Sequence, residues 1–187
     1  MKIHENGKGQ AGQDSFVLNV LNEKRNGWYV EVGSSDPVIY NNTYILETEY
    51  DWQGVGFEWD QGAADIYNSV RKNKCIFADA TQFDYLKYFK DNAFPKQIDY
   101  LQLDIEPAYQ TLAALKQIPL TEYRFSVITY EHDLYADPAN KEIKEESIRI
   151  LSSLGYELLV ENVNDGSPDR IFEDWWIDPQ VIRSTDT

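Results

Sequence analysis

Cysteine is nearly absent from this chain of 187 residues, which contains one cysteine and two histidines. One cysteine cannot form a disulfide within the chain, so a small scaffold stabilised by disulfides is excluded. Long apolar runs are absent as well: the longest uncharged stretch, residues 37–46, includes two asparagines and is much shorter than the ~18 apolar residues of a membrane span. The first residues are polar and lack the apolar segment of a secretory signal. We therefore expect a cytoplasmic protein with no membrane partner.

Positive charge is also scarce, with 17 lysine and arginine residues against 32 acidic residues and a net charge of −15. Such a chain repels polyanions, so nucleic acid and anionic membranes are disfavoured as partners. Hydrophobic residues make up 42% and aromatic residues 14%, which is enough for a packed core. No repeat or low-complexity linker divides the sequence. The sequence therefore predicts one domain over residues 1–187, with an N-terminal helix at about 12–25 and a core at about 27–178.

Short β-rich runs alternate with segments that can be read as helices, a pattern typical of an open, mostly parallel α/β sheet with helices on both faces. Apolar stripes and end signals predict helices over 15–21, 108–115 and 142–154. The last two β-rich runs are joined by the turn-rich residues 163–169, which predict a C-terminal antiparallel hairpin. The predicted strands cover residues 28–32, 55–58, 75–78, 100–104, 125–130, 156–162 and 170–177.

Ligands of open α/β sheets bind outside the carboxyl ends of the strands. The first strand ends in a loop of small residues at 33–35, and Glu58 ends the second strand about 25 residues later, near the spacing at which an acid binds ribose hydroxyls. The alternatives are that the loop is an ordinary turn and that Glu58 is an exposed acid at a strand end. The loop has only the first glycine of G-x-G-x-x-G, and no Gly-Lys-Ser/Thr motif occurs, so a dinucleotide or a phosphate loop is disfavoured.

The next three strand ends also carry polar groups. Asp79 and Ala80 follow the third strand and could bracket an adenine edge; the alternative is that Asp79 or Thr81 caps a helix. Asp104 follows the fourth strand, and the fifth ends in Glu131 and His132. A carboxylate and an imidazole are therefore expected at neighbouring strand ends.

These segments together resemble the FkbM-type S-adenosylmethionine-dependent methyltransferases, which have a class I, Rossmann-like fold. The resemblance spans roughly residues 10–178 and rests on residues 12–14, 31–37, 42–47, 54–58, 103–106 and 131–132. It implies that the cofactor is S-adenosylmethionine. It also implies that the loop of Glu31, Gly33, Ser34 and Ser35 wraps the methionine part, Glu58 holds the ribose with Trp59 beside it, Asp79 and Ala80 meet the adenine, and Asp104 lies near the sulfonium.

Methyl transfer requires an aligned acceptor and a group that removes its proton. His132 is the predicted base, with Glu131 and Asp104 nearby to orient it. A less favoured alternative is a site in which Asp104, Glu131 and His132 hold Mg²⁺ or Mn²⁺.

The chain has no Asp/Asn-Pro-Pro-aromatic run after the fourth strand, so a nucleobase amino acceptor is disfavoured, and the resemblance implies O-methylation of a saccharide or small metabolite. The rival hypothesis is a non-catalytic module that binds a nucleoside or a partner protein.

Two sets of residues are candidates for binding the acceptor. Trp176, with Phe172 and Trp175, could form an aromatic wall, or the same side chains could pack in the core. Tyr40, Asn42 and Thr43 could hydrogen-bond an acceptor or cap the following helix. A homodimer is a further, weak expectation.

Overall fold

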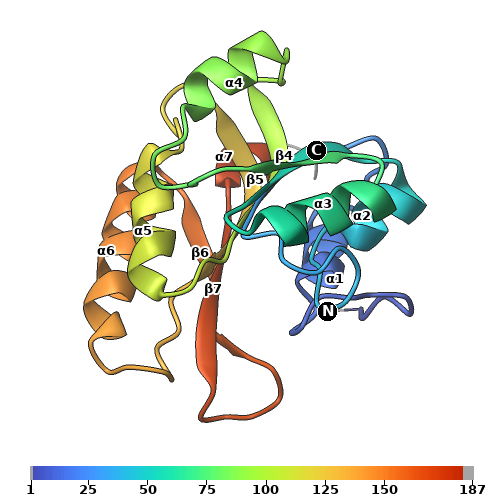
Figure 1. The fold of residues 1–187 in the computed structure, drawn as a ribbon. Helices are drawn as coiled ribbons and strands as arrows, with labels where there is room; N and C mark the ends of the chain where they lie inside the picture. Colours follow the sequence, from blue (N-terminus) through green and yellow to red (C-terminus); the bar gives the residue numbers. More distant parts are fainter. Residues whose placement is uncertain (1, 183–187) are drawn as a thin grey trace.

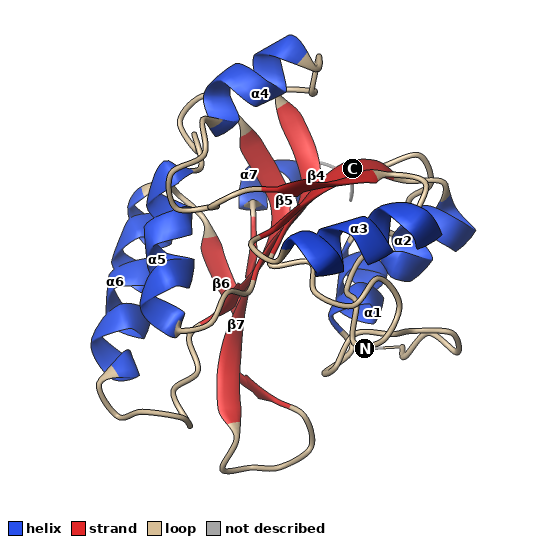
Figure 2. Ribbon diagram, in the orientation of Figure 1, coloured by secondary structure: helices blue, strands red, loops and turns tan. Residues whose placement is uncertain are grey.

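The computed structural model describes residues 2–182, which form a seven-stranded sheet with helices on both faces (Figures 1 and 2). The strand order is β3-β2-β1-β4-β5-β7-β6. The strands are β1 (Trp28–Val32), β2 (Gln53–Glu58), β3 (Lys74–Phe77), β4 (Gln97–Leu103), β5 (Arg124–Glu131), β6 (Glu157–Asn164) and β7 (Ile171–Ile177). The helices are α1 (Gln13–Val20), α2 (Tyr44–Tyr50), α3 (Gln61–Val70), α4 (Tyr85–Asp91), α5 (Ala108–Gln117), α6 (Asn140–Ser153) and α7 (Pro179–Ile182).

The pairing of the strands confirms the predicted fold class. β1 pairs in parallel with β2 and β4, and the parallel ladder continues to β3 on one side and β5 on the other. β7 then pairs antiparallel with β5 and with β6, as predicted for the terminal hairpin. The carboxyl ends of five parallel strands therefore lie along one edge of the sheet, where ligands of this architecture bind.

Two hydrophobic layers cover the central strands. One layer contains Phe89 of α4, Leu115 of α5 and Leu151 of α6, and the other contains Phe16 of α1 and Ile45 of α2. Figure 1 shows α5 and α6 on one side of the sheet and α1, α2 and α3 on the other. Because both faces are covered, the central strands are apolar on both sides rather than alternating.

The aromatic residues of β7 belong to these layers. Trp176 is fully buried in the layer under α4, α5 and α6, and Trp175 stacks on Phe16 of α1 with ring centroids 4.5 Å apart. Neighbouring strand residues point to opposite faces, so the two indoles enter different layers. The predicted aromatic wall is therefore replaced by core packing: Trp176 does not face an acceptor.

Local signals set the ends of several helices. Asp60 accepts a hydrogen bond from the Ala63 amide at 2.8 Å and caps α3, as side-chain oxygens at N-caps do. α1 ends earlier than predicted because Asn22 and Glu23 take positive φ angles of 51° and 53°. No helix among residues 2–182 is both long enough and apolar enough to cross a membrane.

The chain after β1 does not enter a helix directly. Ser35 and Tyr40 have positive φ values of 45° and 56°, which a helix does not allow, and α2 begins only at Tyr44. Tyr40 and Asn42 therefore lie in the loop that precedes α2. The loop returns over the carboxyl edge of the sheet and contributes to the site described next.

Candidate functional site

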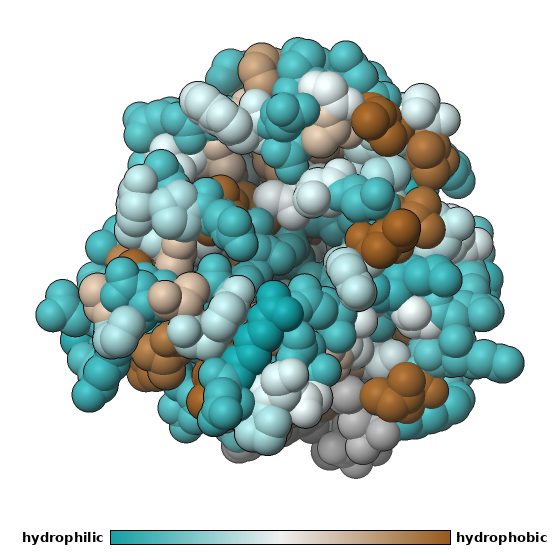
Figure 3. Space-filling view, turned by 60° about the horizontal axis from the view of Figure 1, so that its bottom comes forward, coloured by the Kyte–Doolittle hydropathy of each residue, from teal (hydrophilic) through white to brown (hydrophobic). Residues whose placement is uncertain are grey.

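A cavity of about 750 Å³ lies at the carboxyl edge of the sheet. Figure 3 views the molecule with this edge turned forward and shows a hydrophilic hollow with hydrophobic groups at its rim. Its lining comes from the ends of β1 to β5, from the loop before α2 and from the β6–β7 hairpin. The structure brings all nine residues of the predicted cofactor site into this lining: Glu31, Gly33, Ser34, Ser35, Glu58, Trp59, Asp79, Ala80 and Asp104.

Gly33 forms the tight turn at the end of β1. Its φ is +84°, and a Cβ atom at this position would lie 1.7 Å from the carbonyl oxygen of Asp104. The Gly33 amide donates to the carbonyl oxygen of Phe57 at 2.9 Å. Both the angle and the close backbone approach require glycine, and they let the main chain of β1 meet the end of β4 under the cavity.

Glu58 is fixed by two backbone amides. Its Oε2 accepts from the Ser35 amide at 2.8 Å, and its Oε1 accepts from the Asp60 amide at 2.9 Å. Each carboxylate oxygen can accept more than one hydrogen bond, so this orientation leaves capacity for a diol. Trp59 beside it is 70% exposed and gives the rim a flat apolar surface.

Asp79 lines the cavity and caps no helix, because α4 begins at Tyr85 and its N-cap is Asp84. Its Oδ1 accepts from the amide of Thr81 at 2.9 Å and from the hydroxyl of Thr81 at 2.7 Å. These bonds hold the turn after β3 in place. The carboxylate and the adjacent Ala80 therefore sit at a defined position at the far end of the cavity from Glu131.

The carboxyl groups of Asp104 and Glu131 line the cavity at neighbouring strand ends, and each affects the pKa of the other. Burial raises the pKa of both carboxyls. The negative charge of Asp104 raises the pKa of Glu131 further, so the protonation of one carboxyl depends on that of the other. The arrangement places two carboxyl groups with raised pKa values at neighbouring positions on the cavity wall.

His132 does not line the cavity. Its side chain is fully buried, its Nδ1 accepts from the Leu134 amide at 3.2 Å, and its Nε2 lies 3.5 Å from a carboxylate oxygen of Asp174. Successive residues at a strand end point to opposite sides, so Glu131 in the cavity directs His132 away from it. This placement separates the predicted base from any ligand in the cavity.

The three proposed metal ligands do not converge, because Asp104 and Glu131 line the cavity and His132 does not. Within residues 2–182, no group of three or more histidine, cysteine, aspartate or glutamate side chains is arranged to hold a metal ion.

Of the acceptor candidates before α2, Tyr40 and Asn42 line the cavity. Thr43 does not: it is fully buried, and its hydroxyl donates to Glu31 Oε1 at 2.9 Å. Thr43 therefore acts through Glu31, on the wall of the cavity, rather than by touching an acceptor.

Sequence reasoning missed several lining residues, among them Gln10, Gln102, Tyr135 and Arg170. Gln102 had a readable signal, because it is a polar residue inside an apolar central strand and shares a face with Asp104 two positions on. Gln10, Tyr135 and Arg170 lie in connecting segments whose path over the site depends on tertiary packing.

Three buried polar atoms of the lining have no hydrogen-bond partner among the described residues: Gln102 Oε1, Asn42 Oδ1 and Ser34 Oγ. Buried carbonyl oxygens without donors are costly, and a ligand that supplies donors would satisfy them.

The lining is also strongly acidic. Its carboxyl groups are those of Glu31, Asp36, Glu58, Asp79, Asp104, Glu106 and Glu131. Among the described lining residues only Arg170 is basic, and it pairs with Asp165 at 2.9 Å.

No family model matches this sequence, and no curated protein matches it. Solved structures do resemble it. An O-methyltransferase from Bacillus cereus in complex with SAH has a TM-score of 0.63 at 15% identity, over 93% of this chain and 83% of that one. Aeropyrum pernix fibrillarin with natively bound S-adenosyl-L-methionine has a TM-score of 0.53 at 13% identity, over 82% of this chain and 67% of that one. An rRNA methylase from Streptococcus thermophilus has a TM-score of 0.55 at 12% identity, over 88% and 93%.

At these identities the likeness establishes the fold. The chain has the Rossmann-like fold of the class I S-adenosylmethionine-dependent methyltransferases, with its mostly parallel sheet and antiparallel terminal strands.

Proposed function

We propose that this protein is an S-adenosylmethionine-dependent methyltransferase of the FkbM type that methylates a hydroxyl group of a saccharide or small metabolite. The observation that carries the proposal is the cavity itself: nine residues that the resemblance assigns to cofactor binding, from four separate segments, line one hollow at the carboxyl edge of a methyltransferase fold. The methyltransferase neighbours, two of which hold S-adenosylmethionine or SAH, support the same activity.

The order of the strands gives the cofactor a direction. Asp79 ends β3, Glu58 ends β2 and Gly33 follows β1, and these strands are adjacent in that order. An adenine at Asp79 and a ribose at Glu58 would place the sulfonium and the amino-acid part over β1 and β4. The cofactor supplies an electrophilic methyl group on a sulfonium when bound.

The charge of the lining supports a cationic cofactor. S-adenosylmethionine carries a sulfonium and an ammonium against one carboxylate, so its net charge is positive, whereas dinucleotides and nucleoside triphosphates are polyanions. The lining holds seven carboxyl groups and one arginine. In a partly enclosed cavity such an imbalance attracts the cation and repels the polyanions.

Asp104 is our candidate general base. An acceptor hydroxyl that attacks the methyl group must lose its proton, and a carboxylate within hydrogen-bond reach can take it. Burial raises the pKa of Asp104, which makes it a stronger base than an exposed aspartate, and Glu131 lies at the neighbouring strand end. No metal ion is needed for this proton transfer.

The acceptor would bind beside β4 and β5, under Tyr40, Asn42 and the β6–β7 hairpin. Phosphate groups are disfavoured there because Asp104, Glu106 and Glu131 are acidic and Arg170 is already paired. These charges and the net charge of −15 support a neutral acceptor over nucleic acid, although an rRNA methylase shares the fold.

The test is methyl transfer by the purified protein. Incubation with S-adenosylmethionine and a panel of neutral saccharides, with RNA and phosphorylated sugars in parallel, should yield S-adenosylhomocysteine, measured by mass spectrometry, with the neutral acceptors. Addition of a chelator should leave the rate unchanged. Turnover with RNA alone would contradict the proposed acceptor, and tight S-adenosylhomocysteine binding without turnover on any acceptor would favour the non-catalytic module.

A further inference from the structure

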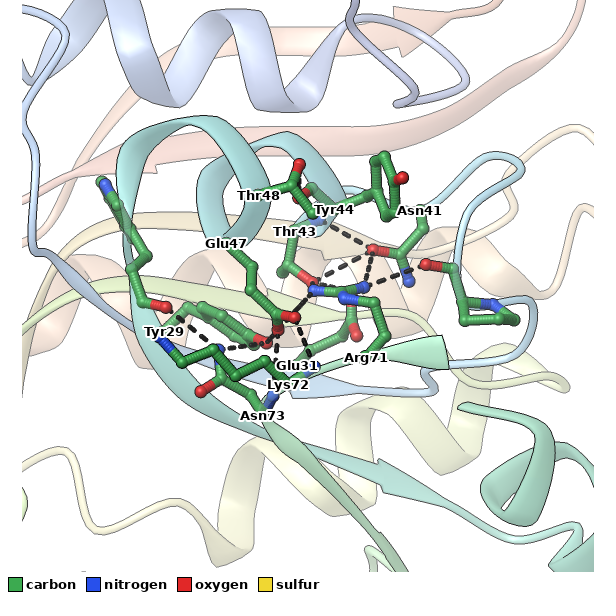
Figure 4. Close-up of polar contacts among 12 residues, drawn as sticks. Tyr29, Glu31, Asn41, Thr43, Tyr44, Glu47, Thr48, Arg71, Lys72 and Asn73 are labelled. Carbon is green, nitrogen blue, oxygen red and sulfur yellow. Dashed lines mark hydrogen bonds and ion pairs between the residues drawn. The ribbon is translucent and has the colours of Figure 1, made fainter. Parts of the chain in front are cut away.

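Arg71, the residue that follows α3, is buried beneath the cofactor end of the cavity without lining it. Its side chain has no exposed surface. Burial of an arginine is costly unless its charge is paired and its donors are satisfied, so the groups around it indicate what it does. Figure 4 shows these groups, which come from β1, from α2 and from the loop before α2.

The guanidinium binds five groups. Its Nη1 donates to the carbonyl oxygen of Pro37 at 3.0 Å and to Asn41 Oδ1 at 2.9 Å. Its Nη2 donates to the hydroxyl oxygen of Tyr29 at 3.2 Å and to that of Thr43 at 3.0 Å. The same nitrogen forms an ion pair with Glu47 at 3.1 Å. One planar fork thus connects three segments, a geometry that lysine cannot reproduce.

The contact with Thr43 reaches the cavity wall. The Thr43 hydroxyl lies 2.9 Å from Glu31 Oε1 and 3.0 Å from Asn41 Oδ1. Because Asn41 Oδ1 already accepts from Arg71 and from the Thr43 amide, we assign the single hydroxyl proton to Glu31. Tyr67 donates to the other oxygen, Glu31 Oε2, at 3.2 Å. A relay from Arg71 through Thr43 therefore orients the Glu31 carboxylate, which lines the cavity.

The contact with Asn41 reaches the loop after β1. Asn41 Nδ2 donates to the carbonyl oxygen of Asp36 at 3.1 Å and to that of Ser34 at 3.3 Å. Because Arg71 holds Asn41 Oδ1, it fixes which way this amide points. Arg71 thus also orients the backbone of residues 34–36, which lies on the same side of the cavity.

We propose that Arg71 is a positioning residue for the amino-acid end of the cofactor, because it holds the Glu31 carboxylate and the 34–36 backbone through Thr43 and Asn41. The inference rests on the proposed function, which places this end of S-adenosylmethionine over β1. Arg71 has no part in holding the nucleoside end, where Glu58 and Asp79 lie.

The affinity for the amino-acid end of the cofactor should depend on pH in variants that lose these contacts. Burial raises the pKa of Glu31, and Arg71 and the hydroxyl of Thr43 lower it. Removal of either contact would raise this pKa further, so Glu31 would become protonated as the pH falls and would no longer pair with an ammonium group. The other titratable groups that interact with Glu31 are Tyr29 of β1, Tyr67 of α3, Cys75 of β3 and Tyr100 of β4, while Glu47 of α2 pairs with the same Arg71.

The experiment measures the affinity of two probes by titration calorimetry from pH 5.5 to 8.5. S-adenosylhomocysteine has the amino-acid part, and 5′-methylthioadenosine has the same nucleoside and sulfur without it. The variants are Arg71→Lys, which keeps the charge, and Thr43→Val, which keeps the shape and the Arg71–Glu47 pair. Arg25→Lys is the matched control, because Arg25 is an exposed arginine paired with Asp51. If Arg71→Lys does not fold, Thr43→Val carries the test.

We expect both variants to bind S-adenosylhomocysteine about tenfold more weakly at pH 7, with a larger loss at pH 6 and a smaller one at pH 8.5. Binding of 5′-methylthioadenosine should stay within about twofold of the wild type, and the Arg25→Lys protein should match the wild type for both probes. Equal losses for the two probes, no loss, or a loss that does not vary with pH would overturn the inference. Failure of the wild type to bind either probe would instead overturn the proposed function.

Discussion

Glu58 offers the sharpest test of the proposed nucleoside contact. Its carboxylate is held by the amides of Ser35 and Asp60 and lies at the cavity rim, where it would accept both hydroxyls of a ribose. Glu58→Ala removes both acceptors. Glu58→Gln keeps the shape but places an NH₂ group against one of the two backbone amides, so it should show an intermediate effect.

The magnitude follows from hydrogen bonding to a charged group, which contributes ~1.5 kcal/mol or more for each bond. Loss of two such bonds is ~3 kcal/mol, or roughly a hundredfold in affinity. A ligand at about 100 times the wild-type Kd stabilises the folded protein by ~2.7 kcal/mol, which raises Tm by roughly 5–10 °C for a chain of this length. In Glu58→Ala the same concentration would be near Kd and would stabilise by only ~0.4 kcal/mol, or about 1 °C.

The assay is thermal unfolding with and without S-adenosylhomocysteine. Glu145→Ala is the control, because it removes an exposed acid of α6 far from the cavity lining. A ligand-induced shift in Glu58→Ala as large as in the wild type would refute the ribose contact. Equal loss of the shift in Glu58→Ala and Glu145→Ala would show that net charge, rather than this carboxylate, determines binding.

Three further predictions concern catalysis, pH dependence and the turn at β1. Asp104→Asn should slow S-adenosylhomocysteine formation about a hundredfold or more and leave its affinity, measured by calorimetry, nearly unchanged; a normal rate would remove the base assignment. Burial raises the pKa of Glu173 to about 8, so its contribution to stability is complete below the unfolded value of about 4.5 and is lost as the pH rises through about 8. The free energy of unfolding should accordingly fall between pH 5 and 8 in denaturant titrations and vary less in Glu173→Gln; equal slopes would contradict this. Gly33→Ala should destabilise the protein by ~2 kcal/mol more than Gly155→Ala. Both glycines have a φ near +80°, but only at Gly33 would the added Cβ lie 1.7 Å from a carbonyl oxygen. Equal losses of stability would show that this contact does not matter.

The sheet was predictable because each strand is a short β-rich run bounded by turn residues, and the turn-rich residues 163–169 signalled the reversal before β7. The faces of the strands were harder to assign. Trp175 and Trp176 are both buried because helices cover both sides of the sheet, and a strand buried on both faces shows no alternation.

The cofactor side of the cavity was more predictable than the acceptor side. Gly33, Glu58 and Asp79 follow strands directly, so strand order alone brings them together. Strand alternation separates His132 from Glu131, a consequence that spacing along the sequence did not show. Arg71 had no local signal, because its role depends on a loop that returns from β1 to cover it.

The most direct measurement is a crystal structure of the protein with S-adenosylhomocysteine. We expect the ribose hydroxyls on Glu58, the adenine beside Asp79 and Ala80, the sulfur facing Asp104, and the amino-acid part at Glu31 and the loop after β1. A ligand bound in the opposite direction, or at a site outside this cavity, would contradict the proposed binding mode.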